Sequence, residues 1–200
     1  MPRQINYTQI RAKLLKSKRV RENLDERVEE RVEKAREELI SDFMNHDVTQ
    51  EILHPENGNI SETLDSKDNK SLFGFIGFDA GSNPIEPIQE ALEEQTKLVG
   101  SKVVGQTQIE YKIQHPSLKE LYSQTPMPWE SGRSWLYGIS HGISGFAYFL
   151  AGYFENLNHS RSGQGIQLED SIRGGSFKVR KDYIEAMIAK FRSRFKKGTN

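Results

Sequence analysis

The chain has no cysteine among its 200 residues. This absence excludes disulfide bonds, thiolate metal sites and a cysteine nucleophile. Hydrophobic residues are also scarce, at 35% of the chain against 28% charged residues, so the core is expected to be modest. We therefore expect part of the stability to come from association with other subunits. The first 20 residues contain charges and no apolar run, so we predict no signal peptide and synthesis in the cytosol.

Charge is balanced over the whole chain but not along it. Residues 1–21 hold seven basic side chains and no acidic one, and residues 173–200 hold nine basic side chains against Asp182 and Glu185. The body between them has 26 acidic and 12 basic residues. Charge separated in this way predicts electrostatic partners and says little about the fold. Solvated termini around an acidic body are the alternative interpretation.

The N-terminal part of the chain has a helical pattern. From Val20 to Phe43 the apolar residues follow one another at steps of three and four, which is the period of one helical face. We predict a long N-terminal helix over residues 1–46, with Asn6 or Thr8 as its N-cap. Because the apolar stripe is narrow and the other faces are charged, this helix is expected to rest on a single surface.

The rest of the chain divides into a loop and a mixed body. Residues 47–70 are polar and show no regular period, so we predict an extended loop there. Residues 71–200 are expected to form an α+β body of the same single domain. Its predicted elements are a strand over 71–79, a helix over 84–98, a strand over 106–115, a helical turn over 116–122, a hairpin over 134–154, an edge strand or turn over 166–172, and an amphipathic helix over 178–197 that buries Tyr183, Ala186, Met187, Phe191 and Phe195. The predicted fold class is α+β: a long N-terminal helix, a small antiparallel sheet with a hairpin, and flanking helices that include a C-terminal amphipathic helix.

Residues 134–154 form a block without any formal charge. The block contains seven aromatic side chains, four glycines, three serines and one histidine. Such a block needs an apolar partner, which is the protein's own core, a lipid bilayer or further copies of the chain. It is just long enough to span a membrane. The glycines, serines and histidine favour a buried or intersubunit sheet instead, so we expect no membrane partner.

We predict no catalytic, cofactor-binding or metal site. Residues 138–142 match the G-x-S-x-G pattern of a hydrolase nucleophile elbow around Ser140. That elbow requires a strand, a strained turn and a helix, whereas this segment reads as a turn within a hairpin. The five histidines are scattered without metal-ligand spacing, and the glycine clusters lack a Walker lysine. A hydrolase that uses Ser140 is kept only as an alternative.

The C-terminal helix ends in a dense basic cluster. The cluster consists of Lys190, Arg192, Arg194, Lys196 and Lys197. Cations near the carboxyl end of a helix suit its dipole. They also predict non-specific contact with phosphates, but no aromatic platform or base-reading motif accompanies them.

Several stretches resemble one family of viral structural proteins. The segments are 46–52 (HDVTQEI), 58–64 (GNISETL), 72–78 (LFGFIGF), 131–145 (SGRSWLYGISHGISG) and 160–166 (SRSGQGI). They are similar to the neck or tail-completion proteins of tailed bacteriophages. In those proteins a long N-terminal helix is followed by a comparable loop and an aromatic segment.

The resemblance implies a non-enzymatic α+β subunit without a cofactor. It implies a homo-oligomeric ring at the head–tail junction of the virion, built from protein made in the host cytoplasm. The implied partners are further copies, connector or adaptor proteins, and tail-tube or tail-terminator proteins. In such a ring the basic ends would face genomic DNA, and the subunit interfaces would be lined by aromatic residues, which we expect to be Phe73, Phe75, Phe78, Trp135, Tyr137, Phe146 and Tyr148.

Two further interpretations stay open. The first is a membrane-associated protein that is anchored through residues 134–154. The second is a different virion component, such as a tail terminator or a head-closure protein.

Overall fold

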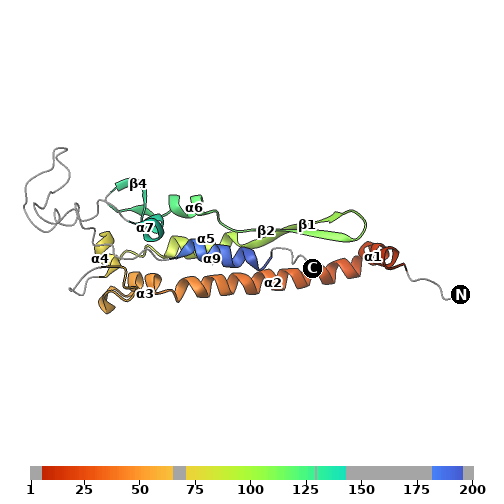
Figure 1. The fold of residues 1–200 in the computed structure, drawn as a ribbon, viewed down its shortest axis with the longest axis horizontal. Helices are drawn as coiled ribbons and strands as arrows, with labels where there is room; N and C mark the ends of the chain where they lie inside the picture. Colours follow the sequence, from red (N-terminus) through yellow and green to blue (C-terminus); the bar gives the residue numbers. More distant parts are fainter. Residues whose placement is uncertain (1–5, 65–70, 129, 143–181, 196–200) are drawn as a thin grey trace, which may run out of the picture.

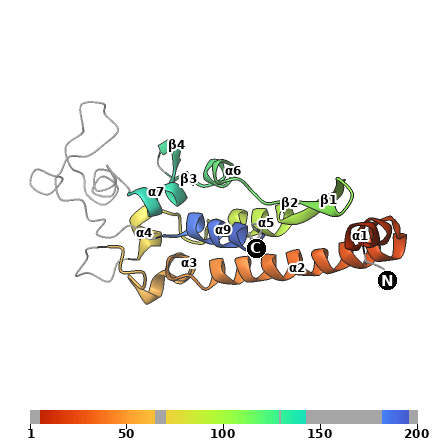
Figure 2. The ribbon, with the colours of Figure 1, turned by 45° about the vertical axis from the view of Figure 1, so that its right-hand side comes forward.

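The computed structural model describes residues 6–64, 71–128, 130–142 and 182–195. These residues form an elongated molecule in which the long helix α2 (Lys18–Met44) follows much of the length (Figure 1). A β-hairpin lies beside the first half of α2, and most other helices gather near its second half (Figure 2). The mixture of helices with small antiparallel sheets confirms the predicted α+β class.

The predicted N-terminal helix is present but divided. Helix α1 (Tyr7–Lys16) ends at Ser17, whose φ of −72° and ψ of 121° are extended, and α2 begins at the next residue. Asn6 caps α1 by accepting a hydrogen bond from the Gln9 backbone N–H at 3.2 Å. The division sets α1 off at one end of the molecule, beyond the packed helices (Figure 1).

The loop predicted over 47–70 is wrong in its first part, which is helical. Helix α3 (Asp47–Leu53) is followed by a 3₁₀ turn, η1 (Pro55–Asn57). His46 caps α3, since its Nδ1 accepts a hydrogen bond from the Val48 N–H at 3.2 Å. Val48 and Ile52 lie one turn apart and are buried, and this short apolar repeat favours the helix.

The strand predicted over 71–79 is also wrong. This segment contains helix α4 (Leu72–Ile76), which ends at Gly77 in the left-handed conformation with φ of +81°. Leu72, Phe75 and Ile76 are buried together. Their spacing of three and four residues fits a helical face, and burial of that face outweighs the strand preference of the aromatic residues.

The predicted strand over 106–115 is confirmed and has a partner that the sequence pattern did not reveal. Strand β2 (Gln108–Gln114) pairs antiparallel with β1 (Lys97–Val104). The register runs from Lys97 opposite Gln114 to Val104 opposite Gln108, with an irregularity between Leu98 and Gly100. β1 had little signal of its own because most of its residues are exposed.

Two of the short helices were predicted correctly. Helix α5 (Glu86–Gln95) lies within the range 84–98, and α6 (Leu118–Ser123) lies within the helical turn expected around 116–122. α6 has a capping box between Ser117 and Glu120. The capping hydrogen bonds from Ser117 lower the pKa of Glu120. A small second antiparallel pair follows, formed by β3 (Pro126–Met127) and β4 (Glu130–Ser134).

The hairpin predicted over 134–154 is wrong where the structure can be described. Residues Trp135–His141 form helix α7, and the Ser134 hydroxyl caps it by accepting from the Tyr137 N–H at 3.1 Å. Trp135, Leu136 and Ile139 are buried, which again is helical spacing. The remainder of this predicted hairpin and the predicted edge strand over 166–172 lie outside the described residues.

The C-terminal helix is confirmed and completes the core. Helix α9 (Ile184–Ser193) is shorter than the predicted 178–197, and Ala186 is exposed rather than buried. Phe43 of α2 stacks on Tyr183 just before α9, with ring centroids 5.8 Å apart. The core cluster takes residues from the second half of α2 and from α3, α4, α5, α6, α7 and α9.

Candidate functional site

A buried carboxyl group joins three segments that are separated along the chain. Glu51 of α3 has no exposed surface. It accepts hydrogen bonds from the Ser61 backbone N–H at 2.8 Å, from the Ser61 hydroxyl at 2.5 Å and from the Leu72 N–H at 2.6 Å. Leu72 is the first residue of α4, so Glu51 provides the N-terminal cap that Ser71 does not provide. The segments 46–52, 58–64 and 72–78 thus meet at one side chain.

The turn held by Glu51 presents two side chains outward. Ser61 and Thr63 are buried and hydrogen-bonded to each other at 2.9 Å, whereas Ile60 and Glu62 are exposed. Glu62 has a φ of +55°, a conformation that costs free energy for a residue with a side chain. The buried hydrogen bonds therefore hold a strained turn in one shape.

The opposite end of the molecule leaves a set of large apolar side chains uncovered. We call this set the apolar end; it consists of Tyr7, Ile10 and Leu14 on α1 and Val99, Val103 and Val104 on β1, each 38–69% exposed. The α1 residues recur at three and four positions and so form one stripe. Val103 and Val104 are successive residues of a strand, so their side chains point to opposite faces of the hairpin. The three large apolar side chains exposed on one face of α1 indicate an interaction surface.

The aromatic residues predicted at subunit interfaces have mixed placements. Phe75 and Trp135 are buried in the chain's own core, so the interface role predicted for these two is wrong. Phe78 is half-buried and packs edge-on against Trp135 at a centroid distance of 5.7 Å, and Phe73 packs beside Phe78 at 5.4 Å. Tyr137 is 47% exposed. The other two predicted residues, Phe146 and Tyr148, lie outside the described part.

The α1 part of the apolar end is visible in the sequence pattern, whereas its β1 part is not. Ile10 and Leu14 continue the stripe of α2 toward the N-terminus, yet this part of the chain is otherwise basic and polar. A stripe that continues into a segment with no packing partner predicts an uncovered helical face. The valines of β1 gave no comparable signal because β1 itself was not predicted.

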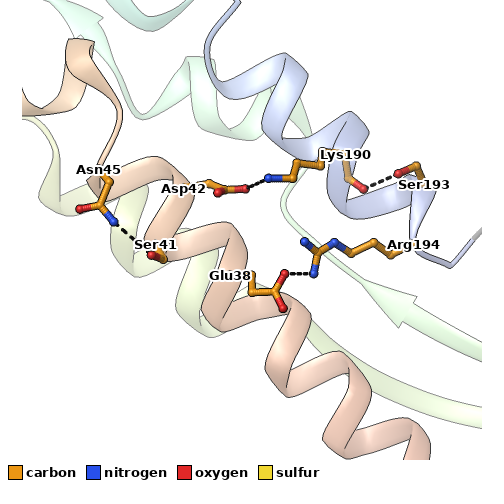
Figure 3. Close-up of polar contacts among 7 residues, drawn as sticks. All are labelled: Glu38, Ser41, Asp42, Asn45, Lys190, Ser193 and Arg194. Carbon is orange, nitrogen blue, oxygen red and sulfur yellow. Dashed lines mark hydrogen bonds and ion pairs between the residues drawn. The ribbon is translucent and has the colours of Figure 1, made fainter.

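The predicted DNA-facing cluster is directed largely toward α2. Lys190 Nζ lies 2.6 Å from the Asp42 carboxylate, and Arg194 pairs with Glu38 (Figure 3). Arg192 donates from Nε to His115 Nε2 at 2.8 Å. Lys196 and Lys197 lie outside the described residues. The charges of Lys190 and Arg194 are therefore balanced within the chain, which corrects the assignment of these two residues to a free DNA-binding surface.

A cavity of about 550 Å³ lies between α6, α7 and the second strand pair. Tyr122, Met127 and Tyr137 supply much of its wall. The Tyr122 hydroxyl donates to Glu185 of α9, and burial together with this carboxylate raises the pKa of Tyr122. The His141 ring stacks on the Tyr137 ring, with the two ring centroids 3.9 Å apart. This cluster joins three helices around the cavity.

The G-x-S-x-G segment does not form a nucleophile elbow. Ser140 lies within α7, and its Oγ is buried without a hydrogen-bond partner among the described residues. A nucleophile elbow would place the serine at a turn between a strand and a helix. The described ranges also contain no group of three or more acidic, histidine or cysteine side chains arranged to hold a metal ion.

None of the helices in the described segments is long and apolar enough to cross a bilayer. Comparison of the chain with protein-family models, with curated protein sequences and with solved structures found no match.

Proposed function

We propose that this chain is a non-enzymatic structural subunit of a tailed-bacteriophage virion. In this proposal it forms a homo-oligomeric ring at the head–tail junction, where it joins the head connector to the tail. The observation that carries the proposal is the apolar end, where six large side chains on α1 and β1 are left uncovered. An assembly subunit has a use for such a surface, since neighbouring copies cover it.

Burial of apolar side chains favours association through this end. Covering the exposed part of each of these side chains contributes on the order of 1 kcal/mol. The three on the α1 stripe can be covered by one partner, and together they supply part of the free energy that a stable contact between subunits requires. A contact between two different surfaces of the same chain closes into a ring when its rotation allows.

The bacteriophage assignment is supported by the family-like segments. The segments 46–52, 58–64 and 72–78 resemble neck or tail-completion proteins, and all three contribute to the environment of Glu51. A set of short motifs that packs into one unit is better support than the same motifs scattered over the fold. Contact with connector, tail-tube or tail-terminator proteins belongs to the same proposal.

The self-association is tested with the full chain and a variant of its apolar end. We expect light scattering and negative-stain images of the wild type to show closed rings. The double variant Ile10→Ser with Leu14→Ser should lose most of this association while its helical circular dichroism stays unchanged, because both residues are about half exposed. The control is Gln9→Ser, an exposed polar position on the same helix, which should assemble like the wild type.

Two results would overturn parts of the proposal. A double variant that assembles as well as the wild type would remove the apolar end as the interface. Antibody labelling of virions that contain the chain should decorate the head–tail junction, and label at another position would overturn the neck assignment.

A further inference from the structure

The chain has two segments of opposite charge, and the structure places them at opposite ends. Residues 1–21 contain seven basic residues and no acidic one, whereas residues 37–64 contain seven acidic residues and neither lysine nor arginine. Helix α1 lies at one end of the elongated molecule, and α3 with the following turn lies at the other end (Figures 1 and 2). The two charged ends therefore cannot meet within one chain.

Part of the acidic segment is already neutralised or buried. Glu38 and Asp42 pair with α9, and Glu51 is enclosed in its network of hydrogen bonds (Figure 3). Glu56 and Glu62 stay exposed, with Glu56 at 3.4 Å from His54 as its only ion-pair neighbour among the described residues. We call residues 55–63, which carry these two carboxylates, the acidic turn.

The basic end offers complementary groups that have no partner of their own. Arg11, Lys13 and Lys16 of α1 are exposed, and none of them forms an ion pair within the described part of the chain. Positions 11 and 13 lie on either side of the apolar stripe through Ile10 and Leu14, as the helical period of 3.6 residues requires. This face of α1 is therefore apolar along its middle and cationic along its edges.

The acidic turn has the matching arrangement. Ile60 is 38% exposed and lies along the chain between Glu56 and Glu62, whose side chains are also exposed. Buried hydrogen bonds fix the turn, because Ser61 bonds to Glu51 and Thr63 bonds to Ser61. A surface that is rigid before binding loses less conformational entropy when it binds. The strain at Glu62 is consistent with a turn that is kept for recognition.

We propose that the acidic turn of one copy docks on α1 of a second copy. In this contact Ile60 lies on the stripe of Tyr7, Ile10 and Leu14, while Glu56 and Glu62 face the cations that flank it. The surfaces differ from each other, so the contact is heterologous and extends from copy to copy until the rotation closes a ring or an open chain forms. The inference rests on the proposed self-association and names the surfaces that make it.

Charge reversal at each end, followed by mixing, tests this contact. Variant A carries Arg11→Glu and Lys13→Glu, and variant B carries Glu56→Lys and Glu62→Lys. Sedimentation velocity should show that each variant alone associates at least about tenfold more weakly than the wild type, because each now opposes like charges. An equimolar mixture should recover association, since both kinds of contact between A and B have opposite charges.

The controls reverse charges away from both ends. Glu90→Lys on α5 and Lys112→Glu on β2 change exposed positions and should associate like the wild type, alone and mixed. The docking proposal fails if A and B associate normally or if their mixture stays dissociated. Rings that persist in both variants would leave the proposed function standing without this contact. Open chains that dissociate in A and in B alone but form again in their mixture would support the contact and overturn the ring. A wild type that stays monomeric at all concentrations would overturn both.

Discussion

Single buried polar residues decide several features of this fold, and Glu51 is the clearest case. Its side chain is fully enclosed, and no lysine or arginine of the described ranges forms an ion pair with it. Burying a carboxyl group costs free energy unless hydrogen bonds replace the water that it loses. Glu51 has three such bonds, and through them it connects α3 to the acidic turn and to α4.

Replacing Glu51 with alanine should lower the free energy of unfolding by about 3 kcal/mol, because the buried Ser61 and Leu72 N–H groups lose their acceptor. Urea denaturation followed by tryptophan fluorescence measures this change. The matched control is Glu86→Ala on the exposed face of α5, which should change stability by less than about 0.5 kcal/mol. Equal effects of the two substitutions would contradict the role given to Glu51.

Three tyrosines give the protein a predictable sensitivity to alkaline pH. Burial, with Asp25 nearby, raises the pKa of Tyr111 to about 12, and burial also raises the pKa values of Tyr122 and Tyr183. Above about pH 10 the unfolded chain loses phenolic protons that the folded chain keeps. The unfolded state then binds fewer protons, so the free energy of unfolding should fall as pH rises from about 10 toward 12.

Urea titrations at about pH 8 and about pH 11 test this expectation. The decrease between the two values should be smaller in Tyr122→Phe than in the wild type, since that variant lacks one of the three phenols. A free energy of unfolding that stayed constant over this range would show that these tyrosines do not retain their protons in the folded state.

At the scale of elements, packing outweighed local preference wherever the sequence prediction was wrong. α4 and α7 contain aromatic residues that favour strands, yet each buries a helical face against the core. α3 was read as a loop because of its polar residues, although the His46 cap and the pair of Val48 and Ile52 indicate a helix. Short helices of this kind take their stability from tertiary contacts.

The attachment of α9 to α2 is a testable case at this scale. We expect apolar burial to hold the two helices together and the ion pairs of Figure 3 to contribute little. Phe191 is 3% exposed, so Phe191→Ala should cost about 3–5 kcal/mol of unfolding free energy. A double-mutant cycle of Asp42→Ala and Lys190→Ala should give a coupling of about 0.5 kcal/mol, and a coupling above about 2 kcal/mol would reverse this ranking.

At the scale of the whole molecule, the important features are the elongated shape and the separation of charge between its ends. The basic α1 and the acidic turn lie at opposite ends (Figure 1), and α1 also carries the exposed stripe of the apolar end. Both an apolar and an electrostatic contribution to assembly are therefore available. The two contributions respond differently to salt.

Self-association should weaken when sodium chloride is raised from about 0.05 M to about 0.5 M, because the Debye length falls below the distance over which the charged ends attract. Sedimentation velocity over a salt series measures the effect. The same increase in salt should weaken the self-association of variant A less than that of the wild type, since α1 of variant A no longer attracts the acidic turn. Association that became stronger with salt in the wild type would indicate that the charged ends repel in the assembled state.

The amino-acid sequence by itself determined the α+β class, the long N-terminal helix, α5, β2, α6 and the C-terminal helix. These elements carry their own period, caps or alternation, which act between residues close together in the chain. Tertiary structure alone decided the helical state of α4 and α7, the pairing of α9 with the acidic side chains of α2, and the network of Glu51. Each of these depends on contacts between residues far apart in the chain, where the free energy of burial and of satisfied hydrogen bonds exceeds that of local preference.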